Sequence, residues 1–137
     1  MPTISWSDKF SIGVEMIDEQ HKNLFRLVND LNSNITGGSS KQALSSALDA
    51  LIDYTKYHFK EEEDYMFNVE YPRLEQHKIA HDNLTQQVLD FRQALSEGKG
   101  DASEFLEFLY DWLTKHIMDQ DKKIGKYMDI KLLKPIL

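Results

Sequence analysis

The chain has 137 residues, of which 41% are hydrophobic and 28% charged; it contains no cysteine and has a formal net charge of −7. This size and composition predict one globular domain with a buried core, and the absence of cysteine excludes disulfides, thiolate zinc sites and iron–sulfur clusters. A negative charge without a basic stripe argues against nucleic acid and anionic membrane surfaces as partners. No apolar run reaches the roughly 20 residues of a membrane span, and the N-terminus lacks a secretion signal, so we expect a cytoplasmic protein.

Hydrophobic periodicity indicates helices along most of the chain. The predicted helices span about residues 18–36, 41–67, 72–97 and 102–122. Asp18 is a suitable N-cap for the first helix, and Pro72 suits the first turn of the third. Gly125 marks the expected limit of the fourth helix.

The segments outside these helices have no strong period. We expect residues 126–137 and the arm before Asp18 to pack over the outside, with Trp6 and Phe10 as anchors of the arm. Because the connections between the helices are short, consecutive helices must be antiparallel neighbours. The sequence therefore predicts an all-α protein: a single domain, residues 1–137, built as an up-down-up-down four-helix bundle with an N-terminal arm and a short C-terminal extension.

In this topology one end of the bundle collects the starts of the first and third helices and the ends of the second and fourth. All five histidines of the chain fall near that end: His21, His58, His77, His81 and His116. At a rise of about 1.5 Å per residue, each lies within roughly 5 to 15 Å of the end. The segment HKIAH at residues 77–81 also places two imidazoles on one helix face.

Two carboxylates occupy matching positions. Glu62 is four residues after His58, and Asp121 is five residues after His116. Seven ligands are too many for one tetrahedral zinc, and histidine-rich sites do not suit calcium or magnesium. Two six-coordinate ions fit better: if both carboxylates and one further oxygen bridge the ions, a single position stays open. Iron is the favoured metal, although manganese or cobalt could use the same ligands.

Four segments, in order, resemble the hemerythrins, and most of all the single-domain bacteriohemerythrins. They are MIDEQH at 16–21, HFKEE at 58–62, YPRLEQHKIAH at 71–81 and WLTKHIMDQD at 112–121. The resemblance covers nearly the whole chain, and no position of the seven-ligand pattern departs from it.

The resemblance implies a centre of two non-haem iron ions joined by an oxo or hydroxo bridge. One iron would take His77, His81 and His116, the other His21 and His58, and Glu62 and Asp121 would bridge them. The implied function is reversible dioxygen binding, for oxygen storage, transport or delivery, at the five-coordinate iron held by His21 and His58. Such a protein is not an enzyme, and its polar outer faces are compatible with a monomer.

Helix spacing also predicts an apolar surround for dioxygen. The expected residues are Leu24, Phe25, Phe59, Trp112, Leu113 and Ile117. Dry surroundings would slow oxidation of a reduced centre; for each residue, ordinary core packing explains the position equally well. Partners for the outer nitrogens of the imidazoles are expected, but no residue stands out as one. Glu61, Glu63 and Asp64 are expected to be exposed charges.

The sequence leaves other functions open. A di-iron oxidoreductase or peroxidase is disfavoured because the chain lacks the paired Glu-x-x-His motifs of oxygen-activating bundles. A sensor module could share every site residue but would need a partner to supply its output. Iron buffering is disfavoured because seven ligands should hold the metal tightly, and a metal-free bundle would bury unpaired polar groups at a cost of several kcal/mol.

Overall fold

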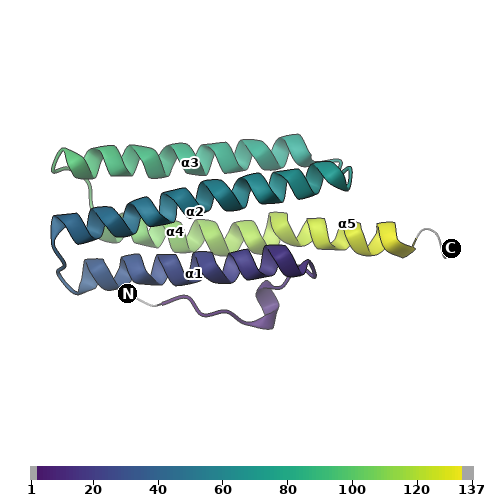
Figure 1. Ribbon diagram of the computed structural model, residues 1–137, viewed down its shortest axis with the longest axis horizontal. Helices are drawn as coiled ribbons and strands as arrows, with labels where there is room; N and C mark the ends of the chain where they lie inside the picture. Colours follow the sequence, from purple (N-terminus) through teal and green to yellow (C-terminus); the bar gives the residue numbers. More distant parts are fainter. Residues whose placement is uncertain (1–2, 134–137) are drawn as a thin grey trace.

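Four long antiparallel helices form the molecule (Figure 1). The computed structural model describes residues 3–133. In chain order, the elements are η1 (Asp8–Phe10), α1 (Glu15–Thr36), α2 (Lys41–Asn68), α3 (Leu74–Ser96), α4 (Ala102–His116), the π-helix η2 (Ile117–Asp121) and α5 (Lys122–Leu133). The described part contains no strand, and the predicted up-down-up-down bundle is confirmed.

Helix α1 begins three residues earlier than the sequence suggested. Asp18 is therefore not its N-cap but lies in the first turn, where its carboxylate accepts hydrogen bonds from Ser11 Oγ (2.6 Å) and from the Ile12 backbone N–H (2.9 Å). The carboxylate ties the N-terminal arm to the bundle instead of capping the helix. Asp101 does cap α4, since its side chain accepts from the N–H groups of Ser103 and Glu104.

The expected helix limit at Gly125 is wrong. The chain stays helical from α4 through η2 into α5, and Gly125 is buried inside α5. A Cβ atom at this position would collide with the backbone carbonyl of Ile12. The glycine thus allows a close approach between the N-terminal arm and α5, which is a tertiary requirement and not a helix stop.

Helix α5 continues the line of α4 and extends beyond the end of the bundle (Figure 1). The Tyr127 hydroxyl donates to the carbonyls of Val69 (2.9 Å) and Glu70 (3.0 Å), and Lys131 Nζ donates to Val69 O (2.6 Å). These bonds join α5 to the turn between α2 and α3. Residues 126–137 were expected to pack over the outside of the bundle. Of these, Tyr127 and Lys131 do contact the bundle, α5 then extends beyond it, and residues 134–137 lie outside the described chain.

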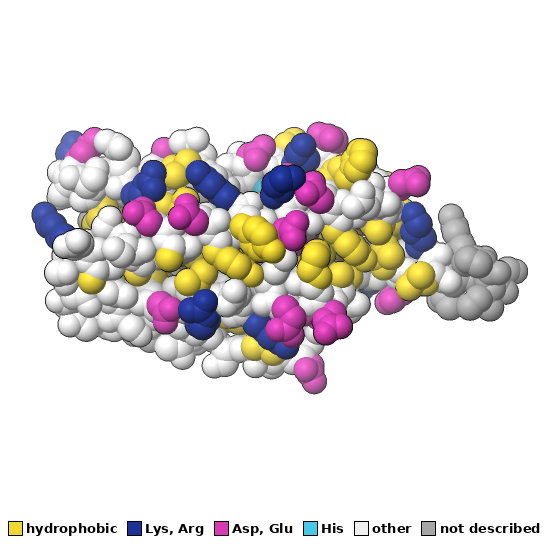
Figure 2. Space-filling view, in the orientation of Figure 1, with side chains coloured by type: hydrophobic (Ala, Val, Ile, Leu, Met, Phe, Trp, Pro, Cys, Tyr) yellow, Lys and Arg dark blue, Asp and Glu magenta, His cyan; other side chains and the backbone are white. Residues whose placement is uncertain are grey.

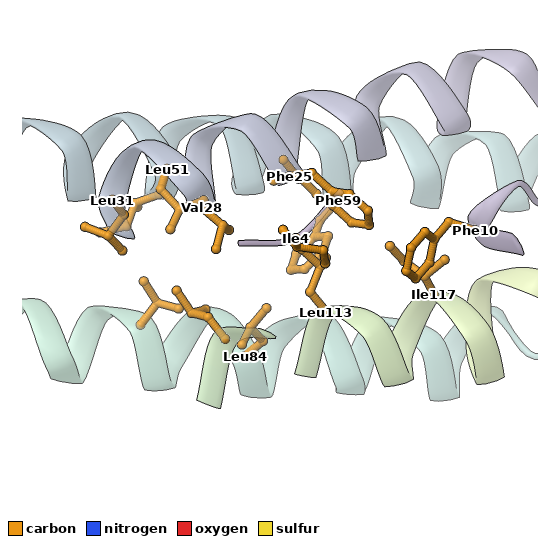
Figure 3. Packing of buried hydrophobic residues seen from close by; sticks show 14 of the residues in the cluster. Ile4, Phe10, Phe25, Val28, Leu31, Leu51, Phe59, Leu84, Leu113 and Ile117 are labelled. Carbon is orange, nitrogen blue, oxygen red and sulfur yellow. The ribbon is translucent and has the colours of Figure 1, made fainter. Parts of the chain in front are cut away.

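The core fills the space between the four helices (Figure 3). Ile17, Leu31, Leu48 and Leu106 are fully buried within it. The N-terminal arm adds an aromatic cluster, in which the Phe10 ring packs edge-on against Phe25 at 5.0 Å and Trp6 lies 5.6 Å from Phe25. Trp6 and Phe10 are therefore the anchors that the sequence suggested.

The face shown in Figure 2 intermixes Lys and Arg with Asp and Glu around a band of hydrophobic side chains. No large area of a single charge sign gathers on this face. Among residues 3–133, none of the helices combines the length and the low charge that crossing a bilayer would need.

Candidate metal centre

One end of the bundle gathers the seven residues proposed from the sequence. Helix α1 contributes His21, α2 contributes His58 and Glu62, α3 contributes His77 and His81, α4 contributes His116, and η2 contributes Asp121. All seven side chains are buried; Glu62 is 0% exposed and His116, the most accessible, only 7%. Ionisable groups are rarely buried to this extent unless they are paired or bind a metal.

The π-helix explains the spacing between His116 and Asp121. In an α-helix, side chains five residues apart face different directions, whereas a π-helix accommodates an extra residue in the turn. Asp121 ends η2 and thereby reaches the same interior as His116, with Oδ1 3.2 Å from His116 Nε2. The extra residue therefore directs the second carboxylate into the site.

Glu62 lies at the centre of the cluster. Its Oε1 is 2.8 Å from His77 Nε2 and 3.2 Å from His81 Nε2. Its Oε2 is 3.3 Å from His58 Nε2 and 3.6 Å from His21 Nε2. One oxygen thus faces the histidines of α3, and the other faces those of α1 and α2.

Asp121 spans the same two sides. Its Oδ2 lies 3.0 Å from His21 Nε2, while Oδ1 lies 2.9 Å from His77 Nε2 and 3.2 Å from His116 Nε2. Both carboxylates therefore present one oxygen to each group of imidazoles, as bridging ligands would. Ligand atoms within 4.8 Å of one another define two overlapping sets: Glu62, His77, His81, His116 and Asp121; and His21, His58 and Glu62.

Several polar atoms of the cluster have no hydrogen-bond partner, and this tests whether a cation fits. Glu62 Oε2 and both carboxylate oxygens of Asp121 are buried without a hydrogen bond. His116 Nε2 also lies 3.1 Å from His77 Nε2 and 3.2 Å from His81 Nε2, although two ring nitrogens in contact can share only one proton. Metal ions would satisfy these converging lone pairs, so the residues fit a metal centre.

Electrostatics favours charged forms in the metal-free cluster. Burial by itself lowers the pKa of His21 and His77, but the carboxylates of Asp121 and Glu62 outweigh burial and raise both pKa values to about 9. Burial likewise opposes ionisation of the acids, yet the histidines hold the pKa of Glu62 well below its usual range and also lower that of Asp121. Protons thus occupy the place of cations, and metal binding must displace them.

The metal-free chain is expected to lose stability as the pH rises from about 6.5 to 9. The pKa values of His21 and His77 are about 9 in the folded chain and near 6.5 in the unfolded chain. Their protonation therefore stabilises the fold fully below pH 6.5, and this stabilisation is lost as the pH rises to 9. Each shift corresponds to at most about 3 kcal/mol. Burial lowers the pKa of His58, so its titration changes the stability only below about pH 6.5. Thermal unfolding at pH 6 and 9.5 checks this, and an unchanged or higher midpoint at pH 9.5 would contradict it.

Two imidazoles have a hydrogen-bond partner on Nδ1, the ring nitrogen that faces away from the central carboxylates, and the sequence did not identify these partners. His58 Nδ1 lies 2.7 Å from Gln20 Oε1, and His81 Nδ1 lies 2.8 Å from Glu63 Oε2. Glu63 is 22% exposed, so its interpretation as an exposed charge is wrong. Both partners are sequence neighbours of candidate ligands, but each faces a histidine of another helix, a relation that periodicity does not reveal.

An apolar wall adjoins the cluster. The Phe59 ring stacks on His81 at 3.7 Å, and the Trp112 ring stacks on His116 at 4.3 Å. Behind them lies a cavity of about 30 Å³. It is lined by Leu24, Val28, Leu51, Thr55, Phe59, Leu84, Val88, Leu109, Trp112 and Leu113. The Thr55 hydroxyl donates to Leu51 O (2.7 Å), which leaves the lining effectively apolar.

Four of the six residues expected around dioxygen line the cavity: Leu24, Phe59, Trp112 and Leu113. Phe25 and Ile117 are buried but do not line it. Phe25 instead packs against Trp6 and Phe10 of the N-terminal arm. Leu24 and Phe25 are consecutive residues, so their side chains point about 100° apart around α1. Leu24 therefore lines the cavity while Phe25 contacts the arm.

The bundle and its buried cluster of imidazoles and carboxylates define a helical protein with a candidate cation site. Residues 12–128 match the family described as "Hemerythrin HHE cation binding domain". The chain therefore belongs to the hemerythrin family, as the sequence motifs suggested.

Similar proteins cover most of the chain. A "Bacteriohemerythrin" from Methylococcus capsulatus (strain Bath) is 34% identical over 127 residues, which is 91% of this chain and 96% of that protein. A "Hemerythrin-like protein" from Naegleria gruberi is 34% identical over 119 residues, covering 87% of this chain and 88% of that one. A solved structure described as "Crystal structure of hemerythrin:wild-type" superposes with a TM-score of 0.84 at 32% identity, covering 91% of this chain and 97% of that chain.

Proposed function

We propose that this protein binds dioxygen reversibly at a centre of two non-haem iron ions. The observation that carries the proposal is the buried cluster of five imidazoles and two carboxylates, in which three of the four carboxylate oxygens lack a hydrogen bond. His77, His81 and His116 would hold one ion, and His21 and His58 the other. Glu62 and Asp121 would bridge them, since each presents an oxygen to both groups.

When bound, the iron pair supplies the change of oxidation state that reversible dioxygen binding requires. The protein's residues control the surroundings. His21 and His58 provide two nitrogens where the other group provides three, so this side has room for a small molecule. Phe59 and Trp112 hold the rings of His81 and His116 in place by stacking, and the apolar cavity next to them excludes water.

An iron count combined with visible spectra tests the proposal. The purified protein is reduced without air, exposed to oxygen and then purged. We expect two irons per chain and an absorption band that appears with oxygen and disappears on purging. Fewer than two irons would contradict the ligand assignment. Immediate irreversible oxidation, or continuous consumption of a reductant with oxygen, would contradict reversible binding and indicate a sensor or an oxidoreductase.

Replacing Trp112 with alanine is expected to leave the iron content unchanged but to speed autoxidation several-fold. The half-buried indole lines both the internal cavity and a surface pocket formed with Lys115, His116, Asp119 and Gln120. Its removal would admit water and protons to the reduced centre. The decay of the oxygen-dependent band measures the rate, with Trp112→Phe as the control that keeps an aromatic wall. Equal rates in wild type and Trp112→Ala would exclude this role.

A further inference from the structure

The five histidines direct Nε2 toward the two central carboxylates, which leaves Nδ1 on the outer side of each ring. A ring nitrogen that binds a metal carries no proton, so the proton of such an imidazole must lie on Nδ1. On His58 this proton is donated to Gln20 Oε1 at 2.7 Å, and on His81 to Glu63 Oε2 at 2.8 Å. Each bond sets the orientation and the tautomer of its ring.

The two acceptors differ in charge. Gln20 offers a neutral amide oxygen and is 7% exposed, whereas Glu63 offers a carboxylate. A carboxylate polarises the N–H bond more strongly than an amide does, and it makes the opposite nitrogen of the ring a better electron donor. In the group formed by His21 and His58, Nδ1 of His21 has no hydrogen-bond partner in the described chain. Within residues 3–133, an outer ring nitrogen thus meets a carboxylate only in the group of His77, His81 and His116, where Glu63 accepts from His81.

Neighbouring acids on α2 do not share this position. Glu61 accepts a hydrogen bond from Tyr57 Oη at 3.3 Å, and Asp64 pairs with Lys60 at 2.9 Å, both on the outer surface. Glu63 alone of these three contacts a candidate ligand. Its bond reaches from α2 to α3, so it also restrains the His81 ring relative to Glu62, the preceding residue on α2.

From this asymmetry we infer that Glu63 is a positioning residue that makes the two metal positions inequivalent. Through His81, its negative charge strengthens binding at the position formed by His77, His81 and His116, and it favours the more highly charged oxidation state there. Gln20 holds His58 in place for the other position without adding charge. The inference rests on the proposed di-iron centre, and it assigns to Glu63 and Gln20 the control of how its two halves differ.

Binding of Co²⁺ to the metal-free protein tests the positioning role without oxygen chemistry. We expect two binding steps in the wild type. Glu63→Ala should weaken one step about 10- to 100-fold and leave the other unchanged, and Gln20→Ala should weaken the other step. The double variant should weaken both steps. Glu63→Gln keeps an acceptor oxygen and should recover part of the loss, whereas the control Glu61→Ala should bind like the wild type.

Redox titration of the iron-loaded protein tests the role of charge. Fe³⁺ accepts one electron to become Fe²⁺, and a nearby negative charge stabilises the higher charge of Fe³⁺. Glu63→Gln should therefore raise the reduction potential of one iron, and Gln20→Glu should lower that of the other. A purely structural contact would leave both potentials at their wild-type values.

The outcomes separate this inference from the proposed function. A wild-type protein that binds fewer than two Co²⁺ and fewer than two irons contradicts both. A wild-type protein with two metal positions in which Glu63→Ala and Gln20→Ala weaken the same step, or neither step, overturns the inference and leaves the di-iron centre intact. Unchanged potentials in Glu63→Gln and Gln20→Glu likewise overturn the assigned effect of charge.

Discussion

Replacing Glu62 with glutamine is expected to reduce the metal content from two ions per chain to one or none. Glu62 is fully buried, and its two oxygens face four of the five histidines. Glutamine has nearly the same shape but no charge, and its amide N–H groups would point at ring nitrogens that must bind metal. In the metal-free chain at pH 6, where His21 and His77 are protonated, losing this buried charge should destabilise the fold by about 3 to 5 kcal/mol.

Glu61→Gln is the matched control for this variant. Glu61 is the preceding residue on α2, but it hydrogen-bonds Tyr57 on the surface and contacts none of the histidines in the cluster. Metal analysis and urea unfolding of the two variants, side by side, separate the loss of a ligand from a general loss of negative charge. Two ions per chain in Glu62→Gln would show that Glu62 does not bridge the metals.

Replacing Gly125 with alanine is expected to destabilise the protein by about 3 kcal/mol. The new methyl group would collide with the backbone carbonyl of Ile12. A backbone atom cannot rotate away as a side chain can, and the Ile12 N–H is held by Asp18, so the arm and α5 must separate. Because η2 directly precedes α5, the shift should also weaken the placement of Asp121 and lower the metal affinity.

Lys126→Ala provides the control for Gly125→Ala. Lys126 is the next residue on α5 and is exposed, so its truncation removes no close contact with the arm. Urea unfolding of both metal-free variants measures the difference in the free energy of unfolding. A change below about 0.5 kcal/mol for Gly125→Ala, the range typical of surface substitutions, would mean that the arm is not packed against α5 as described.

Much of the site could be predicted because it depends on helix register. The four-residue spacings from His58 to Glu62 and from His77 to His81 place each pair on one face of its helix. Short connections determine that the helices alternate in direction, and the distance of each histidine from its helix end then determines its depth in the bundle. These are local properties, which the order of residues specifies directly.

The contacts between helices could not be predicted in the same way. Gln20 and Glu63 were missed because each is adjacent in sequence to a candidate ligand but bonds a ring from another helix. Periodicity tells which stripe of a helix faces inward, but not how far each helix rotates about its axis or which side chains then meet. Phe25 illustrates the same limit, since it turns toward the N-terminal arm and not toward the cavity.

The sequence by itself determined the fold class and the convergence of five histidines and two carboxylates, because both follow from helix period, loop length and register. The tertiary structure alone decided that the chain forms a π-turn before Asp121, continues helically past Gly125, and pairs His58 with Gln20 and His81 with Glu63. Those features depend on how side chains of different helices pack against one another. Packing is a property of the assembled bundle, and no single stretch of sequence contains it.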